Sequence, residues 1–530
     1  MSNKSILEKK TLKRKWPEQI VEIYIYLILC IHPLIFWHYY KDIIDVKYYY
    51  FVICSITLMV ILAGYSIAKR IFFREKTKKD NEFHIISKAR KLWKDASFQE
   101  KVMVFFMLVT AISTFQSDYF FESFWGNEGR LTGLFLTTIY GICFLIVGRL
   151  GKLKVRILDA MLLTGNLVCL FGITDYFQLD ILGFKENIVQ SQIWMFTSTI
   201  GNINLYTIFV AMITAVAMIL FISEKKERLT KKVYYYITMV IAMTALLMGQ
   251  SDNAYLSLVA LFGLSPLYLF RYKWGIRGYA IAISSFMTVI LAIHWMDILY
   301  QDTIKLVIAV EIASKISAYP LIVAACWIVT CLIAWALRKG ESEEASLWWR
   351  RGWIALICIV IIGVLFVLYD CNVAGNAERY GNFQRYVLLN ERWGTNRGFI
   401  WSAALEVYGG YPWYRKLVGF GPDTFGLALY HKYLPKMLEF SGEIYDSAHN
   451  EYIQYLVTLG AAGLLSYLAL MFSSIRRMWK NRTNPYVMAI LFALLCYWFQ
   501  ATVNINQPIT GPIVWTLWGL GLSACARKEV

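Results

Sequence analysis

Charged residues are scarce in this chain. Of its 530 residues, Asp, Glu, Lys and Arg make up only 17%, against about 25% in an average soluble domain. Apolar residues reach 58% and come in blocks, whereas soluble proteins contain roughly 45–50%. The shortage of charge excludes a soluble fold of this length and indicates a membrane protein.

Paired cysteines are also lacking. The chain has ten cysteines, none forms a Cys-x-x-Cys pair, and nearly all lie inside the apolar blocks. This distribution argues against a disulfide framework or a zinc site. It predicts buried cysteines that act as small apolar residues.

The apolar blocks are long enough to cross a bilayer. A helix needs roughly 20 apolar residues to cross about 30 Å of hydrocarbon. We therefore predict an all-α polytopic membrane protein with about 14 (12–14) spans. The blocks are residues 20–39, 48–68, 102–117, 131–148, 157–177, 197–222, 233–249, 253–270, 278–299, 319–337, 353–369, 450–474, 485–504 and 508–525.

Basic residues alternate between the two sides of the predicted bundle. If the N-terminus is cytoplasmic, the termini and the loops placed inside hold 39 of the 53 Lys and Arg residues. This asymmetry predicts a multi-pass protein of the cytoplasmic membrane with both termini inside the cell. It also explains the net charge of +17 as a signal of topology beside anionic lipid, which argues against a nucleic-acid partner.

One long external loop divides the chain into three parts. Residues 1–369 hold about eleven spans, residues 370–449 form the loop, and residues 450–530 hold about three spans. The loop carries eight basic and eight acidic residues together with many aromatic residues. Its length and aromatic content predict ordered short helices on the outer membrane face.

Three local patterns stand out in and after this loop. Residues 397–408 have helical apolar spacing, and residues 419–423 (GFGPD) indicate a tight turn. At the loop's end, we expect Asp446 or Ser447 to cap the next helix, with His449 in its first turn. Further along that helix, Gly460 and Gly463 predict a small face for close helix packing.

Five motifs together resemble the O-antigen ligase and O-antigen polymerase superfamily. Asn450, nine residues and then Gly460-x-x-Gly463 resemble the family's HN-x9-GxxG signature. Four further stretches resemble family motifs in the same order, namely residues 126–133 (GNEGRLTG), 199–204 (TIGNIN), 396–401 (NRGFIW) and 419–425 (GFGPDTF). The resemblance covers roughly residues 115–470 and is strongest over 395–465. It implies the GT-C-like O-antigen ligase fold.

The chain departs from the family at one place. Where the family often has Ser-Arg-Gly at the start of a middle span, this chain has Ser251-Asp252-Asn253. One expected cationic contact to the lipid-linked substrate is therefore missing. Arg130, Arg379 or Arg385 could replace it.

The resemblance implies a membrane glycosyltransferase that uses a glycan on undecaprenyl diphosphate at the outer membrane face. The partners would be this donor, a glycan or glycolipid acceptor and the bilayer. The chain has no Asp-x-Asp motif, so we expect a metal-independent reaction without a cofactor, and inversion at the transferred sugar. An arginine must then stabilise the leaving diphosphate, and Arg397 is the first candidate.

His449 is the candidate base, because an ordinary imidazole is mostly neutral at pH 7. The positive helix end would lower the pKa of His449, whereas Asp446 or Glu443 would raise it, and the sequence leaves that balance open. Asn450 is a candidate substrate ligand or a capping residue. Asn202 and Asn204 are candidate substrate ligands, although polar packing between helices is the favoured role.

Two other functions remain open on the sequence. A flippase or transporter of lipid-linked oligosaccharides could have as many spans, although transporters usually show two related halves. A single long loop without an N-terminal counterpart favours the enzyme. A non-catalytic family member that only binds the glycan carrier is the third possibility, because of the departure at Asp252.

Overall fold

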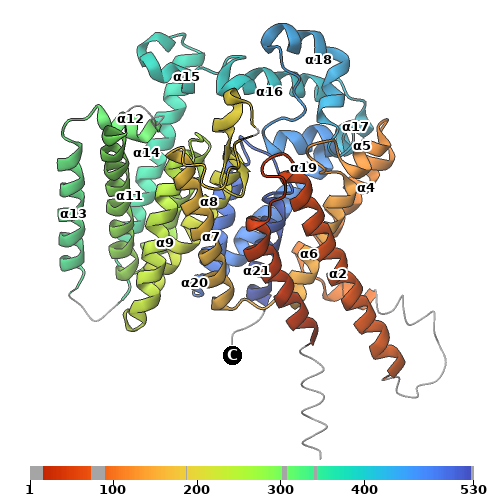
Figure 1. Cartoon of the computed structure of the whole chain (residues 1–530), viewed down its shortest axis with the longest axis horizontal. Helices are drawn as coiled ribbons and strands as arrows, with labels where there is room; N and C mark the ends of the chain where they lie inside the picture. Colours follow the sequence, from red (N-terminus) through yellow and green to blue (C-terminus); the bar gives the residue numbers. More distant parts are fainter. Residues whose placement is uncertain (1–15, 73–89, 187, 301–306, 339–342, 527–530) are drawn as a thin grey trace, which may run out of the picture.

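The structure is a computed structural model that describes residues 16–72, 90–186, 188–300, 307–338 and 343–526. The described chain is almost entirely helical (Figure 1), as predicted. The basic N-terminus and most of the basic segment 69–101, which contribute to the predicted orientation, lie outside the described residues.

Each of the fourteen predicted blocks coincides with a helix. The first is a helix over residues 16–26 that continues into η1 (Leu27–Ile31) and η2 (His32–Leu34). The others are α2 (Ile43–Phe72), α4 (Phe98–Phe115), α6 (Leu134–Leu150), α7 (Val155–Tyr176), α8 (Ile203–Ser223), α9 (Leu229–Met248), α10 (Ala254–Leu269), α11 (Lys273–Leu299), α13 (Tyr319–Ala336), α14 (Leu347–Asn372), α19 (Glu451–Lys480), α20 (Pro485–Gln500) and α21 (Gly511–Ala526).

Among the described helices, eight are long and apolar enough to cross a membrane: α2, α4, α7, α8, α11, α13, α14 and α19. Four others, α6, α10, α20 and α21, are apolar but shorter. The protein is therefore a multi-pass membrane protein, and the count of fourteen spans stays a prediction.

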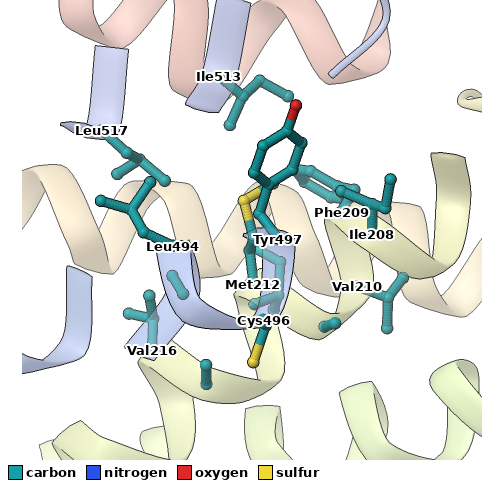
Figure 2. Packing of buried hydrophobic residues seen from close by; sticks show 14 of the residues in the cluster. Ile208, Phe209, Val210, Met212, Val216, Leu494, Cys496, Tyr497, Ile513 and Leu517 are labelled. Atoms are coloured by element: carbon teal, nitrogen blue, oxygen red, sulfur yellow. The ribbon is translucent and has the colours of Figure 1, made fainter. Parts of the chain in front are cut away.

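Helix α8 lies at the centre of the bundle. All of its residues from Leu205 to Ile222 are buried, as expected for a helix that is apolar on every side. Its closest neighbours are α20 and α9. Figure 2 shows Met212 of α8 beside Cys496 and Tyr497 of α20 in this packed region.

The long loop is an ordered cap at one end of the bundle (Figure 1). Its helices are η5 (Ala377–Phe383), α15 (Gln384–Val387), α16 (Trp393–Gly409), α17 (Trp413–Val418) and α18 (Phe425–Ser441). The cap has its own apolar core, in which Ile400, Ala403 and Ala404 are buried and Val407 is partly buried. The apolar face predicted over residues 397–408 is thereby confirmed.

Short elements connect the larger helices. They are α5 (Phe120–Trp125), η3 (Gln190–Met195), η4 (Lys226–Arg228), α12 (Ile308–Ser314) and an antiparallel pair of strands, β1 (Phe196–Thr197) and β2 (Gly201–Asn202). The predicted block 197–222 thus begins as a small hairpin, and its helix starts only at Ile203.

Candidate active site

Helix α19 begins one residue after Asn450. The Asn450 Oδ1 atom accepts hydrogen bonds from the backbone N–H groups of Tyr452 and Ile453, each at 3.0 Å, so Asn450 is the N-cap. The prediction that Asp446 or Ser447 caps this helix is wrong. The backbone of His449 has φ +45°, which turns the chain just before the helix and leaves His449 outside it.

The residues around His449 hold its backbone on both sides. The Trp401 indole N–H of α16 donates to the carbonyl of Ala448 at 2.9 Å, and the backbone N–H of Ala448 donates to Gln454 Oε1 at 2.9 Å. The cap helix and α19 therefore fix this short segment together, and the half-buried His449 follows directly.

Arg130 lies in the loop between α5 and α6 and is 8% exposed. Its Nε and Nη2 donate to the two carboxylate oxygens of Asp446 at 2.8 and 2.6 Å, a bidentate pair. Burial raises the pKa of Asp446, but the hydrogen bonds and charge of Arg130 outweigh it and hold that pKa below its ordinary value. The Nη1 of Arg130 is buried without a partner among the described residues.

Arg397 is the first regular residue of α16. Gly394, Thr395 and Asn396 before it all have positive φ, so the chain makes a tight left-handed turn there. The Nη1 of Arg397 donates to the carbonyl of Gly394 at 2.8 Å, while its Nε is buried and has no partner in the described chain. Arg130 and Arg397 can thus each offer one buried N–H donor to a ligand.

Burial and the two arginines determine the protonation of His449. Burial is the largest effect that lowers the pKa of His449, and the charges of Arg130 and Arg397 lower it further. The charge of Asp446 opposes them by a smaller amount, and the resulting pKa is about 4. The balance that the sequence leaves open is settled mainly by burial and these arginines. The imidazole is therefore neutral at pH 7, the form that can accept a proton, and its lowered pKa makes it a weaker base than an ordinary histidine.

Only one of the three arginines proposed to replace the missing cation acts on His449. Arg130 does so, whereas the exposed Arg379 pairs with Asp370 at 3.6 Å. The guanidinium carbon of Arg385 lies 4.8 Å from the ring centre of Tyr386. Neither Arg379 nor Arg385 is among the charges that shift the pKa of His449.

The departure from the family places a carboxylate where an arginine was expected. The Asn204 Oδ1 atom accepts from Ser251 Oγ at 2.6 Å and from Asn253 Nδ2 at 3.0 Å, which fixes this turn. Burial lowers the pKa of Arg397, and the charge of Asp252 opposes that change. Asp252 is therefore close enough to act on the candidate phosphate ligand.

The two asparagines of the residue 199–204 motif have structural partners. Asn202 caps α8, because its Oδ1 accepts from the backbone N–H groups of Asn204 and Leu205 at 2.9 and 3.4 Å. Asn204 holds the turn that contains Asp252. Capping and polar packing, the favoured roles, account for both side chains.

A break in α19 explains the first glycine of the motif, Gly460. Gly460 has φ +68° and ψ −172°, so the helix is interrupted there. The carbonyls of Val457 and Thr458 instead accept from the backbone N–H groups of Phe420 and Gly421, at 3.1 and 2.9 Å. The predicted close packing is confirmed at Gly460, where an added side-chain carbon would meet the backbone of Leu417 in α17. At Gly463 the atoms nearest to an added carbon belong to Leu459 of the same helix.

Asp423 has a role that the sequence motifs did not predict. Its Oδ2 accepts from the backbone N–H groups of Asn127 and Thr132 at 2.7 and 3.0 Å, which ties the loop that carries Arg130 to the residue 419–425 turn. Burial raises the pKa of Asp423 to about 6, although these hydrogen bonds and Arg130 lower it. The sequence offers one signal for this role, an acidic residue within the predicted turn. In the structure, the backbone of Asp423 has a positive φ there.

Carboxylates of the described residues do not form a metal-binding cluster. No three His, Cys, Asp or Glu side chains among them lie together in a way that could hold a metal ion. The site instead gathers its positive charge from two arginines. Metal independence stays a prediction.

The fold and the site define a class: a multi-pass membrane protein with a histidine and two arginines where an ordered helical cap meets the bundle. Residues 306–468 match the protein family described as O-antigen ligase. The chain therefore carries an O-antigen ligase domain, and the resemblance drawn from its motifs is confirmed. The matched segment contains Arg397, His449 and Gly460, whereas Arg130 lies outside it. No curated protein matches the chain.

The domain places the protein in polysaccharide biosynthesis at a membrane. Members of this family act on lipid-linked glycans and glycolipid acceptors. The match over residues 306–468 indicates a family of glycan-transfer proteins and leaves the particular donor and acceptor open.

Proposed function

We propose that the protein is a membrane glycosyltransferase that transfers or polymerises a glycan from an undecaprenyl-diphosphate donor on the outer face of the membrane. The observation that carries the proposal is a neutral His449 that is close enough to feel the charges of two arginines, each with a buried N–H donor to offer. This reaction uses a base for the proton of the acceptor hydroxyl and cationic N–H donors for the leaving diphosphate.

The proposed reaction is one displacement. The acceptor hydroxyl loses its proton to His449, and its oxygen forms a bond to the anomeric carbon of the donor sugar. The bond from that carbon to the diphosphate oxygen breaks, and the diphosphate leaves with the electron pair. A single displacement inverts the anomeric configuration.

Arg130 and Arg397 stabilise the negative charge that grows on the leaving oxygen. Their N–H groups are already oriented, so little reorganisation is needed as the charge develops. Asp446 holds Arg130 in place through two hydrogen bonds. We propose that this positive charge makes a divalent metal unnecessary.

The test is an assay of purified protein in liposomes with a lipid-linked glycan donor and an acceptor. His449→Ala and Arg397→Ala should each reduce transfer at least about a hundredfold. His431→Ala is the matched control, because His431 lies on α18 of the same cap and bonds to Tyr119 instead. That variant should keep its activity.

Three outcomes would count against parts of the proposal. Full transfer by a folded His449→Ala variant excludes His449 as the base, and loss of transfer on chelation of divalent metals contradicts metal independence. If the wild type binds the donor and moves it across the bilayer without transfer, the protein is a transporter. A ladder of products indicates a polymerase, and a single addition indicates a ligase.

A further inference from the structure

A large apolar cavity lies away from the candidate active site, among α11, α13, α14 and the residue that follows α10. Its volume is about 800 Å³, and its lining includes Phe270, Tyr279, Trp348 and Trp353. Lining residues such as Val329 are exposed on the outside of the bundle. In a bilayer, the cavity is therefore open to lipid.

Three arginines gather next to this cavity. Arg271 follows the lining residue Phe270, Arg350 follows the lining residue Trp349, and Arg482 lies just beyond the end of α19. Burial lowers the pKa of Arg271, and the charges of Arg482 and Arg350 lower it further. The three positive charges are thus close enough to repel one another.

Arg271 has no anionic partner among the described residues. Its Nε is buried without a hydrogen bond there, and its guanidinium carbon lies 5.9 Å from the ring centre of Trp479. The nearby Glu343 makes its ion pair with Arg277, at 4.0 Å. The cluster can therefore accept an anion that comes from outside the chain.

We propose that this site binds an anionic phospholipid, with its phosphate on Arg271, Arg350 and Arg482 and an acyl chain in the apolar cavity. Arginine binds phosphate through paired N–H donors, and basic pockets between membrane helices bind anionic lipid head groups. A zwitterionic lipid leaves the cluster's charge uncompensated. A free phosphate leaves the cavity unfilled.

The position of the site separates this lipid from the glycan donor. Helix α19 starts at Glu451, beside His449, is interrupted at Gly460, and ends at Lys480, next to Arg482. It runs along the whole of α4, because the carbonyl of Thr458 accepts from Ser113 near the end of α4 and the carbonyl of Ser473 accepts from Gln99 at its start. The arginine cluster is therefore at the opposite end of the bundle from His449. A donor with its diphosphate at His449 cannot also place it on Arg271.

The experiment measures thermal unfolding of the full-length protein in detergent with phosphatidylglycerol or phosphatidylcholine added. Phosphatidylglycerol should raise the midpoint by about 2 °C or more over phosphatidylcholine. Arg271→Gln should lose this difference. Arg338→Gln is the charge-matched control, because Arg338 is exposed at the end of α13, and it should keep the full response.

A second pair of variants tests the cavity without changing charge. Gly352 lines the cavity, and Gly363 lies on the same helix outside the cavity lining. A side-chain carbon added at either glycine would have no atom of the described chain within 4 Å, beyond its own helix backbone and chain neighbours. Gly352→Phe should therefore fill the cavity and lose the response, whereas Gly363→Phe should keep it.

Equal stabilisation by phosphatidylcholine would overturn the proposal, as would an unchanged response in both Arg271→Gln and Gly352→Phe. Inorganic phosphate that reproduces the full shift without lipid would also overturn it, since the site would then bind only the anion. If Arg271→Gln is not recovered folded, Arg482→Gln removes another charge of the same cluster.

Discussion

His449 has a backbone conformation that few residues other than glycine adopt, with φ +45°. Such a conformation costs on the order of 1–3 kcal/mol and persists only where neighbours hold it. Here Trp401 and Gln454 fix Ala448 on one side, and the Asn450 cap fixes the other. The turn keeps His449 out of the helix and within reach of the arginine charges.

The protonation of His449 gives a prediction at this scale. Burial, Arg130 and Arg397 lower the pKa of His449 to about 4. We therefore expect the His449 imidazole to stay mostly neutral from pH 8 down to about pH 5. The acid limb of kcat/KM, which reports the free enzyme, should have its midpoint near pH 4. An ordinary histidine would place it near about 6.5.

Removal of one arginine should move this midpoint in a known direction. Arg397→Gln takes away a charge that disfavours the imidazolium, so the pKa of His449 should rise toward its ordinary value. An NMR titration of the imidazole, assigned by its loss in His449→Ala, measures this without relying on activity. Arg379→Gln is the control. A wild-type pKa near about 6.5 that Arg397→Gln leaves unchanged would contradict the assignment.

The motifs identified His449 and Arg397 as candidates because both follow recognisable spacings. They could not choose among Arg130, Arg379 and Arg385, since the choice depends on which loop folds back onto His449. That fold-back is made by Asp423, a single buried carboxylate far along the chain from Arg130. Contacts of this kind leave no periodic pattern in the sequence.

At the scale of elements, hydrophobic blocks predicted every long helix outside the cap, because burial in a bilayer requires continuous apolar sequence. The ends of the helices were less predictable. Helix α8 starts six residues into its predicted block, after the hairpin of β1 and β2, and α19 starts after a residue with positive φ. Local hydrogen bonds, to which hydropathy is insensitive, decide such ends.

The break in α19 gives the prediction for this scale. Gly460 occupies a backbone region that is essentially restricted to glycine. A side-chain carbon there would clash with the backbone of Leu417 and lie 2.6 Å from Gly419 N. Gly460→Ala should therefore lower the free energy of unfolding by about 2 kcal/mol or more. The midpoint of thermal unfolding should fall by several degrees, and transfer should be reduced.

Gly363→Ala provides the matched control. Gly363 lies inside α14 with no atom of the described chain near an added carbon, and alanine favours a helix interior by roughly 0.5–1 kcal/mol. This variant should be as stable as the wild type or slightly more so. A Gly460→Ala protein with unchanged stability would show that the break does not depend on glycine.

For the whole molecule, ion pairs join the first helix to two of the loops that are predicted to face the cytoplasm. Lys154 and Arg156, at the start of α7, pair with Glu22 of the first helix, and Lys231 of α9 pairs with Asp159 of α7. The N-terminal helix and two predicted inner loops are therefore neighbours. This arrangement agrees with the alternation of basic residues, while the side of the membrane stays a prediction.

Labelling of single cysteines tests that side. Glu443 lies in the cap just after α18, and Glu227 lies in η4 between α8 and α9; both are exposed. If the cap faces outward, a membrane-impermeant maleimide should label Glu443→Cys in intact spheroplasts and Glu227→Cys only after lysis. The unmodified chain measures the background from its native cysteines. The reverse pattern would place His449 and both arginines in the cytoplasm, where no carrier-linked glycan on the outer leaflet could reach them, and would overturn the proposed reaction together with the orientation.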